Sequence, residues 1–303
     1  MSKIGRRLAQ LLIGLCAALA FAGAADAGVV VTTDGDTAIA EISLDDANGH
    51  TYTAEVTITF DSVQNLSPRS LNLTAELVDP NDAALAQRLP AGMSLDPAFP
   101  MLITIEPPEL PALFASGFED RDGGGVLTFL NTYQIEVHTA DLQYADGSPY
   151  RLLKAPVGDA FDDVTSDVLA GSVRTRGRGG AFSQFLVAKD SATTLVPLLL
   201  TAVGKLTVLQ LDVVAAALDD VLRLDLLGLI ADISADLVLV VLDVTAALAS
   251  LDQFIAEVTA HAGTDIPNVW SADHSVDNKA GQMLQQAQTL RFTLVRMQTA
   301  PLL

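Results

Sequence analysis

The pattern of apolar and polar residues changes its period once along the chain. From residue 28 onward, short segments alternate apolar with polar or β-branched residues, as half-buried strands do. Clusters rich in Gly, Asp and Asn separate these segments and are typical of turns. Nine segments fit the pattern: 28–33, 37–44, 51–60, 70–78, 101–106, 126–139, 149–157, 171–176 and 182–188. Their number and spacing predict an antiparallel immunoglobulin-like β-sandwich over residues 28–190.

After residue 190 the polar residues recur at helical spacing on an otherwise apolar background. We expect one helix over 195–227, a break at Gly228, and a second helix that runs to His261 or Ala262 with Gly263 as its stop. The polar positions that define the two stripes are Lys205, Asp212, Asp219 and Arg223 in the first helix and Asp232, Asp236, Asp243 and Ser250 in the second. The segment LVLVVL within the second helix also fits a short buried strand, an alternative that periodicity leaves open.

A third helix is expected to begin at Asp277, which suits the N-cap position. Its apolar residues then lie on one face: Ala280, Met283, Leu284, Ala287, Leu290, Leu294 and Met297. The helical part is therefore predicted to be a helical hairpin completed to a three-helix bundle.

Composition supports a boundary near Asp190. Residues 28–190 hold 12 aromatic residues and ten prolines, whereas residues 191–303 hold three of each. A chain of 303 residues is also long enough for two cores. The fold class we expect is therefore multidomain α and β, with a sandwich domain at 28–190 and an all-α domain at 191–303. We expect few contacts between the two domains.

The first 27 residues have the pattern of a secretory signal peptide. Lys3, Arg6 and Arg7 precede an uncharged run over 8–25, and the small-residue sites Ala22-Gly23-Ala24 and Ala25-Asp26-Ala27 lie at its end. A retained membrane anchor is the alternative, but the second half of the run is Ala and Gly. We therefore expect a secreted or periplasmic protein.

Charge and cysteine content exclude several classes of protein. The chain has 17 basic and 37 acidic residues, a net charge of −20, which disfavours a nucleic-acid partner. Its single cysteine, Cys16, lies within the leader, so the exported chain lacks a thiol for catalysis, redox chemistry or zinc. In the helical part the longest uncharged stretch is 14 residues, 191–204, whereas a span needs about 20. We expect no membrane span in the mature chain.

Residues 148–190 resemble the closing strands of immunoglobulin-like sandwiches in exported and surface proteins of bacteria. The resemblance rests on Gly158 and Phe161 in a turn, on Asp163 and Thr165, and on the strand Phe182-Ser183-Gln184-Phe185. The whole chain is similar to an uncharacterised family of exported bacterial proteins, a domain of unknown function with a sandwich followed by helices. That resemblance implies a fold and no chemistry.

Three arginines stand out on so acidic a chain. Arg174, Arg176 and Arg178 alternate along one predicted strand, so their side chains should leave the sheet on the same face. Such a row could read carboxylate, sulfate or phosphate groups. The alternatives are an edge strand protected by charge and pairing with acids of the preceding strands.

Other candidate chemistry is weaker. No cofactor motif is present, but four acidic turns could offer oxygen ligands to calcium: Asp34 with Asp36, Asp45 with Asp46, the 119–123 loop, and Asp159 with Asp162 and Asp163. The scattered histidines His50, His138, His261 and His274 are expected to be structural, although His261 and His274 flank Trp270 in one loop.

The function that fits these observations is an exported, non-enzymatic binding or structural module of the cell envelope. Two alternatives stay open: a polyanion or glycan binder that uses the arginine face, and a hydrolase with carboxylates at the interdomain cleft. The helices expose too much apolar surface for the rest of the chain to cover. We therefore expect a protein partner or self-association through the helical domain, with the apolar residues of 206–248 at its centre.

The leader generates the first testable prediction. Export should leave a mature protein that begins at Ala25 or Gly28, because signal peptidase cleaves after a small residue in an A-x-A site. N-terminal sequencing of exported material tests this, and a chain that still begins at Met1 or Ser2 would contradict it.

Overall fold

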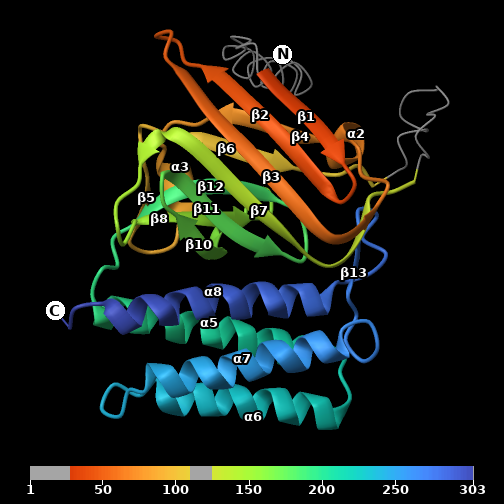
Figure 1. The fold of residues 1–303 in the computed structure, drawn as a ribbon, viewed down its shortest axis with the longest axis vertical. Helices are drawn as coiled ribbons and strands as arrows, with labels where there is room; N and C mark the ends of the chain where they lie inside the picture. The colour runs from red at the N-terminus through yellow and green to blue at the C-terminus, as the bar shows by residue number, and fades with distance from the viewer. Residues whose placement is uncertain (1–27, 110–124, 303) are drawn as a thin grey trace, which may run out of the picture.

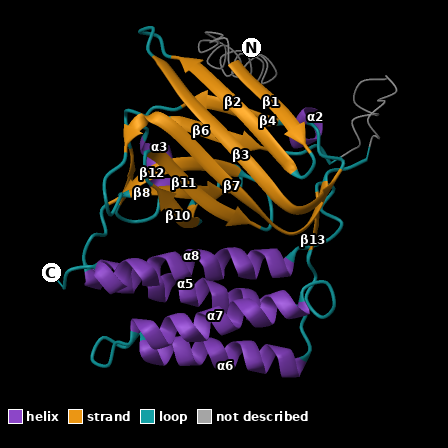
Figure 2. Cartoon of the chain, in the orientation of Figure 1, coloured by secondary structure: helices purple, strands orange, loops and turns teal. Residues whose placement is uncertain are grey.

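The computed structural model describes residues 28–109 and 125–302, and it shows a mixed α and β protein. Two antiparallel sheets lie above a layered group of helices (Figures 1 and 2). The helix nearest the sheets is α8 and the farthest is α6 (Figure 1). The described strands β1 to β12 all precede residue 191, and α5 to α8 all follow it.

The first sheet has the order β1-β2-β3-β7-β11-β10, with β13 also paired to β7. All its pairings are antiparallel. Its strands are β1 (Gly28–Asp34), β2 (Thr37–Asp45), β3 (Thr51–Gln64), β7 (Thr128–Gln143), β10 (Thr165–Leu169), β11 (Ser172–Gly179) and β13 (Val269–Ser271).

The second sheet has the order β4-β6-β12-β8-β9, with β5 paired to β12. Two short helices, α2 (Pro68–Leu71) and α3 (Ala83–Arg88), lie among its strands in the sequence. The strands are β4 (Leu73–Leu77), β5 (Met93–Leu95), β6 (Met101–Ile105), β8 (Tyr150–Ala155), β9 (Asp162–Asp163) and β12 (Gln184–Asp190).

The two sheets share one apolar core. In β2 and β3 every second side chain is buried, as the period of a strand dictates. These residues, among them Ile42 and Val56, belong to the same cluster as Ile103 of β6 and Phe185 of β12. All nine predicted strand segments contain a strand, and β5, β9, β10 and β13 are additional.

The prediction of three helices after residue 190 is wrong, because the described chain forms four there. They are α5 (Leu195–Ala215), α6 (Asp220–Asp236), α7 (Val244–His261) and α8 (Lys279–Thr299). Gly228 lies inside α6 and ends no helix. The segment that includes LVLVVL is neither helix nor strand from Val238 to Leu242, but a turn between α6 and α7.

Two aspartates of the polar stripes, Asp219 and Asp243, explain why α6 and α7 begin where they do. The Asp219 carboxylate accepts hydrogen bonds from the backbone N–H groups of Val221 and Leu222, and Asp243 does the same for Thr245 and Ala246. Both are therefore N-caps, which fits aspartate better than a position within a helix.

The remaining helix ends are close to those expected. Helix α7 ends at His261, and Gly263 follows with a positive φ of 81°, as predicted. The N-cap of α8 is Asn278 rather than Asp277, because the Asn278 side chain accepts from the Gly281 N–H.

The expectation of few contacts between the two parts is wrong. Strand β13 lies between α7 and α8 in the sequence, yet it pairs with residues 128–130 of β7. It places Trp270 in the core shared by the two sheets, stacked on Phe129 with ring centroids 5.1 Å apart and edge-on to Phe182 at 5.3 Å. The sheet core thus includes the only tryptophan of the chain.

Glycine permits the helices to approach the sheets closely at the start of α8. A Cβ atom on Gly180, just after β11, would lie 2.5 Å from the backbone of Gly281. A Cβ on Gly281 would collide with the carbonyl oxygen of Asn131 in β7. No side chain fits at either position without a shift of backbone.

A matched pair of substitutions tests this contact. Gly281→Ala should lower the free energy of unfolding by about 1–3 kcal/mol, because the added methyl group overpacks the contact with Asn131. Gly228→Ala in α6, where nothing lies within 4 Å of the added atom, should instead stabilise by up to about 1 kcal/mol through helix propensity. Urea unfolding measures both, and equal changes in the two variants would refute a close contact at Gly281.

Candidate functional site

The junction between the sheets and the helices contains a buried ionic network. Lys205 of α5 extends its ammonium group to Asp163 of β9, with Nζ 2.7 Å from Oδ2. Nζ also donates to the hydroxyls of Thr289 and Thr293 on α8, at 2.7 and 3.0 Å. The other oxygen of Asp163 accepts from the backbone N–H of Thr165 at 2.9 Å. Both charges are thus paired and hydrogen-bonded, as burial requires.

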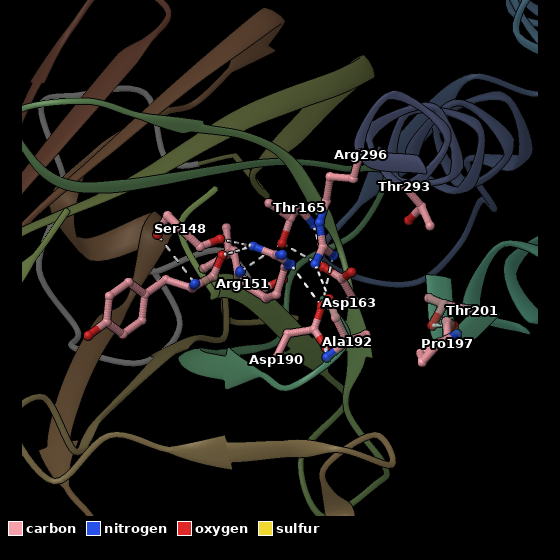
Figure 3. A network of polar contacts seen from close by, with 12 residues as sticks. Ser148, Arg151, Asp163, Thr165, Asp190, Ala192, Pro197, Thr201, Thr293 and Arg296 are labelled. Carbon is pink, nitrogen blue, oxygen red and sulfur yellow. Dashed lines mark hydrogen bonds and ion pairs between the residues drawn. The ribbon is translucent and has the colours of Figure 1, made fainter. Parts of the chain in front are cut away.

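A second part of the network lies where β12 ends and the chain turns toward the helices (Figure 3). Asp190 Oδ2 is 2.8 Å from Nη1 of Arg296 on α8 and 3.3 Å from Nε of the fully buried Arg151 on β8. Arg151 donates from Nη1 to the Ser148 carbonyl at 2.8 Å, while its Nε and Nη2 have no hydrogen-bond partner among the described residues. The ring of Phe292 lies 5.2 Å from the Arg151 guanidinium carbon. One carboxylate therefore joins two arginines from the two parts of the chain.

Burial and pairing act in opposite directions on the titration of these groups. Burial by itself raises the pKa of Asp163, but the Lys205 charge and the hydrogen bonds from Lys205 and Thr165 outweigh it, so the pKa lies below its usual range. Burial lowers the pKa of Lys205, and Asp163 counteracts this effect. Burial, then repulsion by Arg296, lowers the pKa of Arg151 to about 10. Pairing thus opposes the effect of burial on the pKa of both Asp163 and Lys205.

The same junction holds a cleft that is built at an irregularity of the first sheet. Between the pairs Phe60–Tyr133 and Ser62–Leu130, two residues of β7, Asn131 and Thr132, lie opposite Asp61 of β3. Asn131 adopts a positive φ of 56°. Such a bulge redirects side chains and is common beside binding sites.

The bulge is also where the helical part docks. The Asn131 N–H donates to the carbonyl of Asn268 at 2.7 Å, and its side-chain oxygen accepts from the Asn268 amide at 2.8 Å. Its own carbonyl accepts from the side-chain amide of Asn278, the N-cap of α8, at 2.6 Å. Asn268 and Asn278 thus satisfy the backbone N–H and carbonyl of Asn131, which the bulge removes from the ladder.

The cleft has a volume of about 340 Å³, and seven of its ten lining residues are polar. Arg178 of β11 enters it and donates from Nη1 to the Thr132 hydroxyl at 3.0 Å. Thr132 in turn donates to Asp61 from both its N–H and its hydroxyl, at 3.1 and 3.0 Å. The lining residues are Asp61, Asn131, Thr132, Arg178, Thr259, Asn268 and Gln288, with Ile255, Ala262 and Leu284 as the apolar part.

The three candidate arginines share one face of β11, but they do not act as one row. Arg174 and Arg176 both approach Glu136 of the neighbouring strand, Arg176 by a short hydrogen bond and Arg174 at 4.0 Å. Pairing with an acid of a preceding strand, one of the alternatives, therefore describes Arg174 and Arg176. The edge-strand alternative is wrong, because β11 lies between β7 and β10. Of the three, Arg178 alone reaches the cleft.

The described acidic turns do not assemble a calcium site. Within 28–109 and 125–302 no group of three or more His, Cys, Asp or Glu side chains could hold a metal ion. Asp46 accepts hydrogen bonds from the N–H groups of Asn48 and His50 in its own turn, and Asp163 is paired with Lys205. The 119–123 loop lies outside the described residues.

The histidines do not converge on one site. His261 lies 2.7 Å from Asp265 at the end of α7, and this hydrogen bond, the largest influence, raises the pKa of His261. His138 contacts Ser172 and His50 packs edge-on against Tyr52. His274, with a positive φ of 54°, lies near the Trp270 ring.

A second hollow, of about 400 Å³, lies beside Trp270 and His274. Glu106 and Glu109 line it, and both are exposed. Among the described lining residues these two carry the carboxylates, so the hydrolase hypothesis would require them as its acid and base.

Sequence reasoning missed most residues of the junction. Lys205 was recognised only as part of a polar stripe, and Asp163 only as a structural or calcium residue, because 42 residues separate the two. Asn131, Asn268 and Asn278 had no distinguishing local signal, although an Asn near a helix start is a recognised capping residue.

These features define a class of protein: a pair of antiparallel sheets whose core and polar junction are completed by a helical layer. The model of a family of unknown function, DUF6689, matches residues 12–298, and the chain belongs to this family. The resemblance to a domain of unknown function is thereby confirmed. Comparisons with curated proteins and with solved structures gave no match.

The Lys205–Asp163 pair yields a prediction with a defined pH dependence. Lys205→Met should lower the free energy of unfolding at pH 7 by about 3–5 kcal/mol, because it leaves a buried carboxylate unpaired. Without Lys205, burial raises the pKa of Asp163 above its unfolded value, so this loss should shrink as the pH falls toward 4 and the carboxyl becomes neutral.

The double variant Asp163→Asn with Lys205→Met is the control and should recover most of the stability at pH 7. Urea unfolding at both pH values measures all three proteins. A single variant as stable as wild type at pH 7, or one whose deficit grows on acidification, would contradict the assignment.

Proposed function

We propose that this chain is an exported, non-enzymatic binding module of the bacterial cell envelope, and that the Arg178 cleft takes an acidic glycan. The leader pattern supports export, and the closing-strand motifs support an immunoglobulin-like character for the two sheets. The observation that carries the ligand assignment is an arginine oriented by Thr132 within a polar cleft.

The donors and acceptors of the cleft suit a sugar that carries a carboxylate. The Arg178 guanidinium, tied at Nη1, can offer its remaining N–H groups to a carboxylate in a fork. The Asp61 carboxylate accepts from sugar hydroxyls, and the amides of Asn268 and Gln288 both donate and accept. A volume of about 340 Å³ is at the small end of ligand sites, so a short segment of a chain fits better than a large ligand.

The net charge of −20 supports this choice over a nucleic acid. A polymer with a phosphate at every residue would be repelled by the chain as a whole. A short uronic-acid oligosaccharide brings only a few charges to the site and offers several hydroxyls on each sugar, so its binding relies more on local hydrogen bonds. A site of this kind needs no metal and no nucleophile, in keeping with a non-enzymatic module.

Binding of a uronic-acid oligosaccharide tests the proposal. Calorimetric titration of the wild-type protein with oligogalacturonate should show binding, and the same oligosaccharide with its carboxylates methyl-esterified should bind at least tenfold more weakly. Arg178→Ala should weaken the binding of oligogalacturonate about 10- to 100-fold, because charge-assisted hydrogen bonds contribute about 1.5–3 kcal/mol. Arg178→Lys should also weaken it, since lysine lacks the fork.

Arg174→Ala is the matched control. It removes an arginine from the same face of the same strand, but one that approaches Glu136 rather than the cleft, and it should leave binding unchanged. Melting temperatures establish that the variants are folded. No binding by wild type, or equal losses in Arg174→Ala and Arg178→Ala, would overturn the proposal.

A further inference from the structure

The outward face of α5 is apolar and carries no charge. Its exposed large side chains include Leu200, Val203, Val208 and Leu211. The two charged residues of the helix, Lys205 and Asp212, are only partly exposed, and Lys205 points inward to Asp163. A charge-free apolar stripe along a 21-residue helix, about 32 Å long, is unusual on the surface of a monomer.

The residues of this face are nearly symmetric about the middle of the helix. Reading outward from a point between residues 205 and 206, Gly204 mirrors Thr207, Val203 mirrors Val208, and Leu200 mirrors Leu211. Exposure follows the same symmetry: Val203 and Val208 are 44% and 39% exposed, and Leu200 and Leu211 are 69% and 61% exposed. A face of this kind is complementary to a copy of itself in antiparallel orientation.

Gly204 lies near the centre of the face, and nothing within the chain requires a glycine at this position. Nothing lies within 4 Å of a Cβ atom placed on it, and its φ is not in the left-handed region. Glycine inside a helix costs about 1 kcal/mol relative to alanine. Small residues at the centre of a helix face allow a second helix to approach closely, and the small Thr207 is the matching residue.

We propose that α5 is the contact of a two-fold homodimer, in which two copies of the helix pack antiparallel with Gly204 and Thr207 at the crossing point. Each Leu200 then meets Leu211 of the other copy, and each Val203 meets Val208. The inference is independent of the proposed glycan site. One pair of helices is a small interface, so the dissociation constant should be in the micromolar range.

A lipid surface is the competing occupant. Among the described residues α5 is the one helix long and apolar enough to cross a membrane, judged by length and composition alone. Insertion would carry Lys205 away from Asp163 and leave both charges unpaired. Helices that lie on membranes display Lys and Arg beside the apolar face, whereas α5 has no exposed cation and the chain carries a charge of −20. These charges favour a second copy.

Cysteine cross-linking tests the antiparallel register. The exported protein is produced from the full chain with Cys16→Ser, which leaves an introduced cysteine as its only thiol. A mixture of Leu200→Cys and Leu211→Cys proteins should form a mixed disulfide-linked dimer. Each variant alone should not, because identical residues are separated by eleven residues along the antiparallel pair, about 16 Å, beyond the reach of a disulfide.

A matched pair of glycine substitutions tests the contact itself. Gly204→Glu and Gly228→Glu each replace a helix-interior glycine with open space around it, so both should remain folded. In sedimentation at tens of micromolar, wild type and Gly228→Glu should be dimers. Gly204→Glu, which puts two carboxylates near the two-fold axis, should raise the dissociation constant at least tenfold.

Three results would overturn the proposal. They are a wild-type monomer at tens of micromolar, equal behaviour of the two glutamate variants, and self-cross-linking of Leu200→Cys or Leu211→Cys as efficient as that of the mixture. Flotation of the wild-type protein with vesicles of neutral and anionic phospholipid, abolished by Gly204→Glu, in place of dimerisation would assign the face to a lipid surface instead.

Discussion

The ammonium group of Lys205 lies between the sheets and the helices, and its carboxylate partner, Asp163, comes from the other part of the chain. A buried charge is tolerated only with such a partner, so this pair constrains how the helices can lie on the sheets. Thr289 and Thr293 take up the remaining protons of Lys205 and bring α8 into the same arrangement. Rotation or sliding of α5 would leave a charge without its partner.

Apolar packing also holds the helical part against the sheets. Trp270 enters the aromatic cluster between the two sheets from a strand that belongs, by sequence, to the helical part. Burial of so large a side chain is worth a few kcal/mol, while the asparagines at the β7 bulge and the arginines at Asp190 determine orientation. The Arg178 cleft lies at the same bulge, so the contacts that dock the helices also shape the proposed binding site.

The sequence predicts what depends on local periodicity and misses what depends on contacts between distant residues. All nine long alternating segments contain strands, because alternation reports one buried face. Strand β13 has only three residues, too few to show alternation. It forms because it pairs with a segment of β7 about 140 residues earlier in the chain. Asp219 and Asp243 lie at the spacing of a polar helical stripe, which favours a position within a helix. Aspartate is also a good N-cap residue, and both are N-caps in the structure. The alternation of Arg174, Arg176 and Arg178 predicts a shared face. It does not predict that Arg176 pairs with Glu136 while Arg178 donates to Thr132, because both partners lie on another strand.

The polar junction and Trp270 should make the sheets and the helices unfold as one cooperative unit. Equilibrium unfolding in urea, followed at the same time by Trp270 fluorescence and by helical circular dichroism at 222 nm, measures this cooperativity. We expect a single transition with the same midpoint for both signals, because loss of either part breaks buried ion pairs of the other. Two separated transitions, with the helical signal lost while Trp270 stays buried, would contradict it.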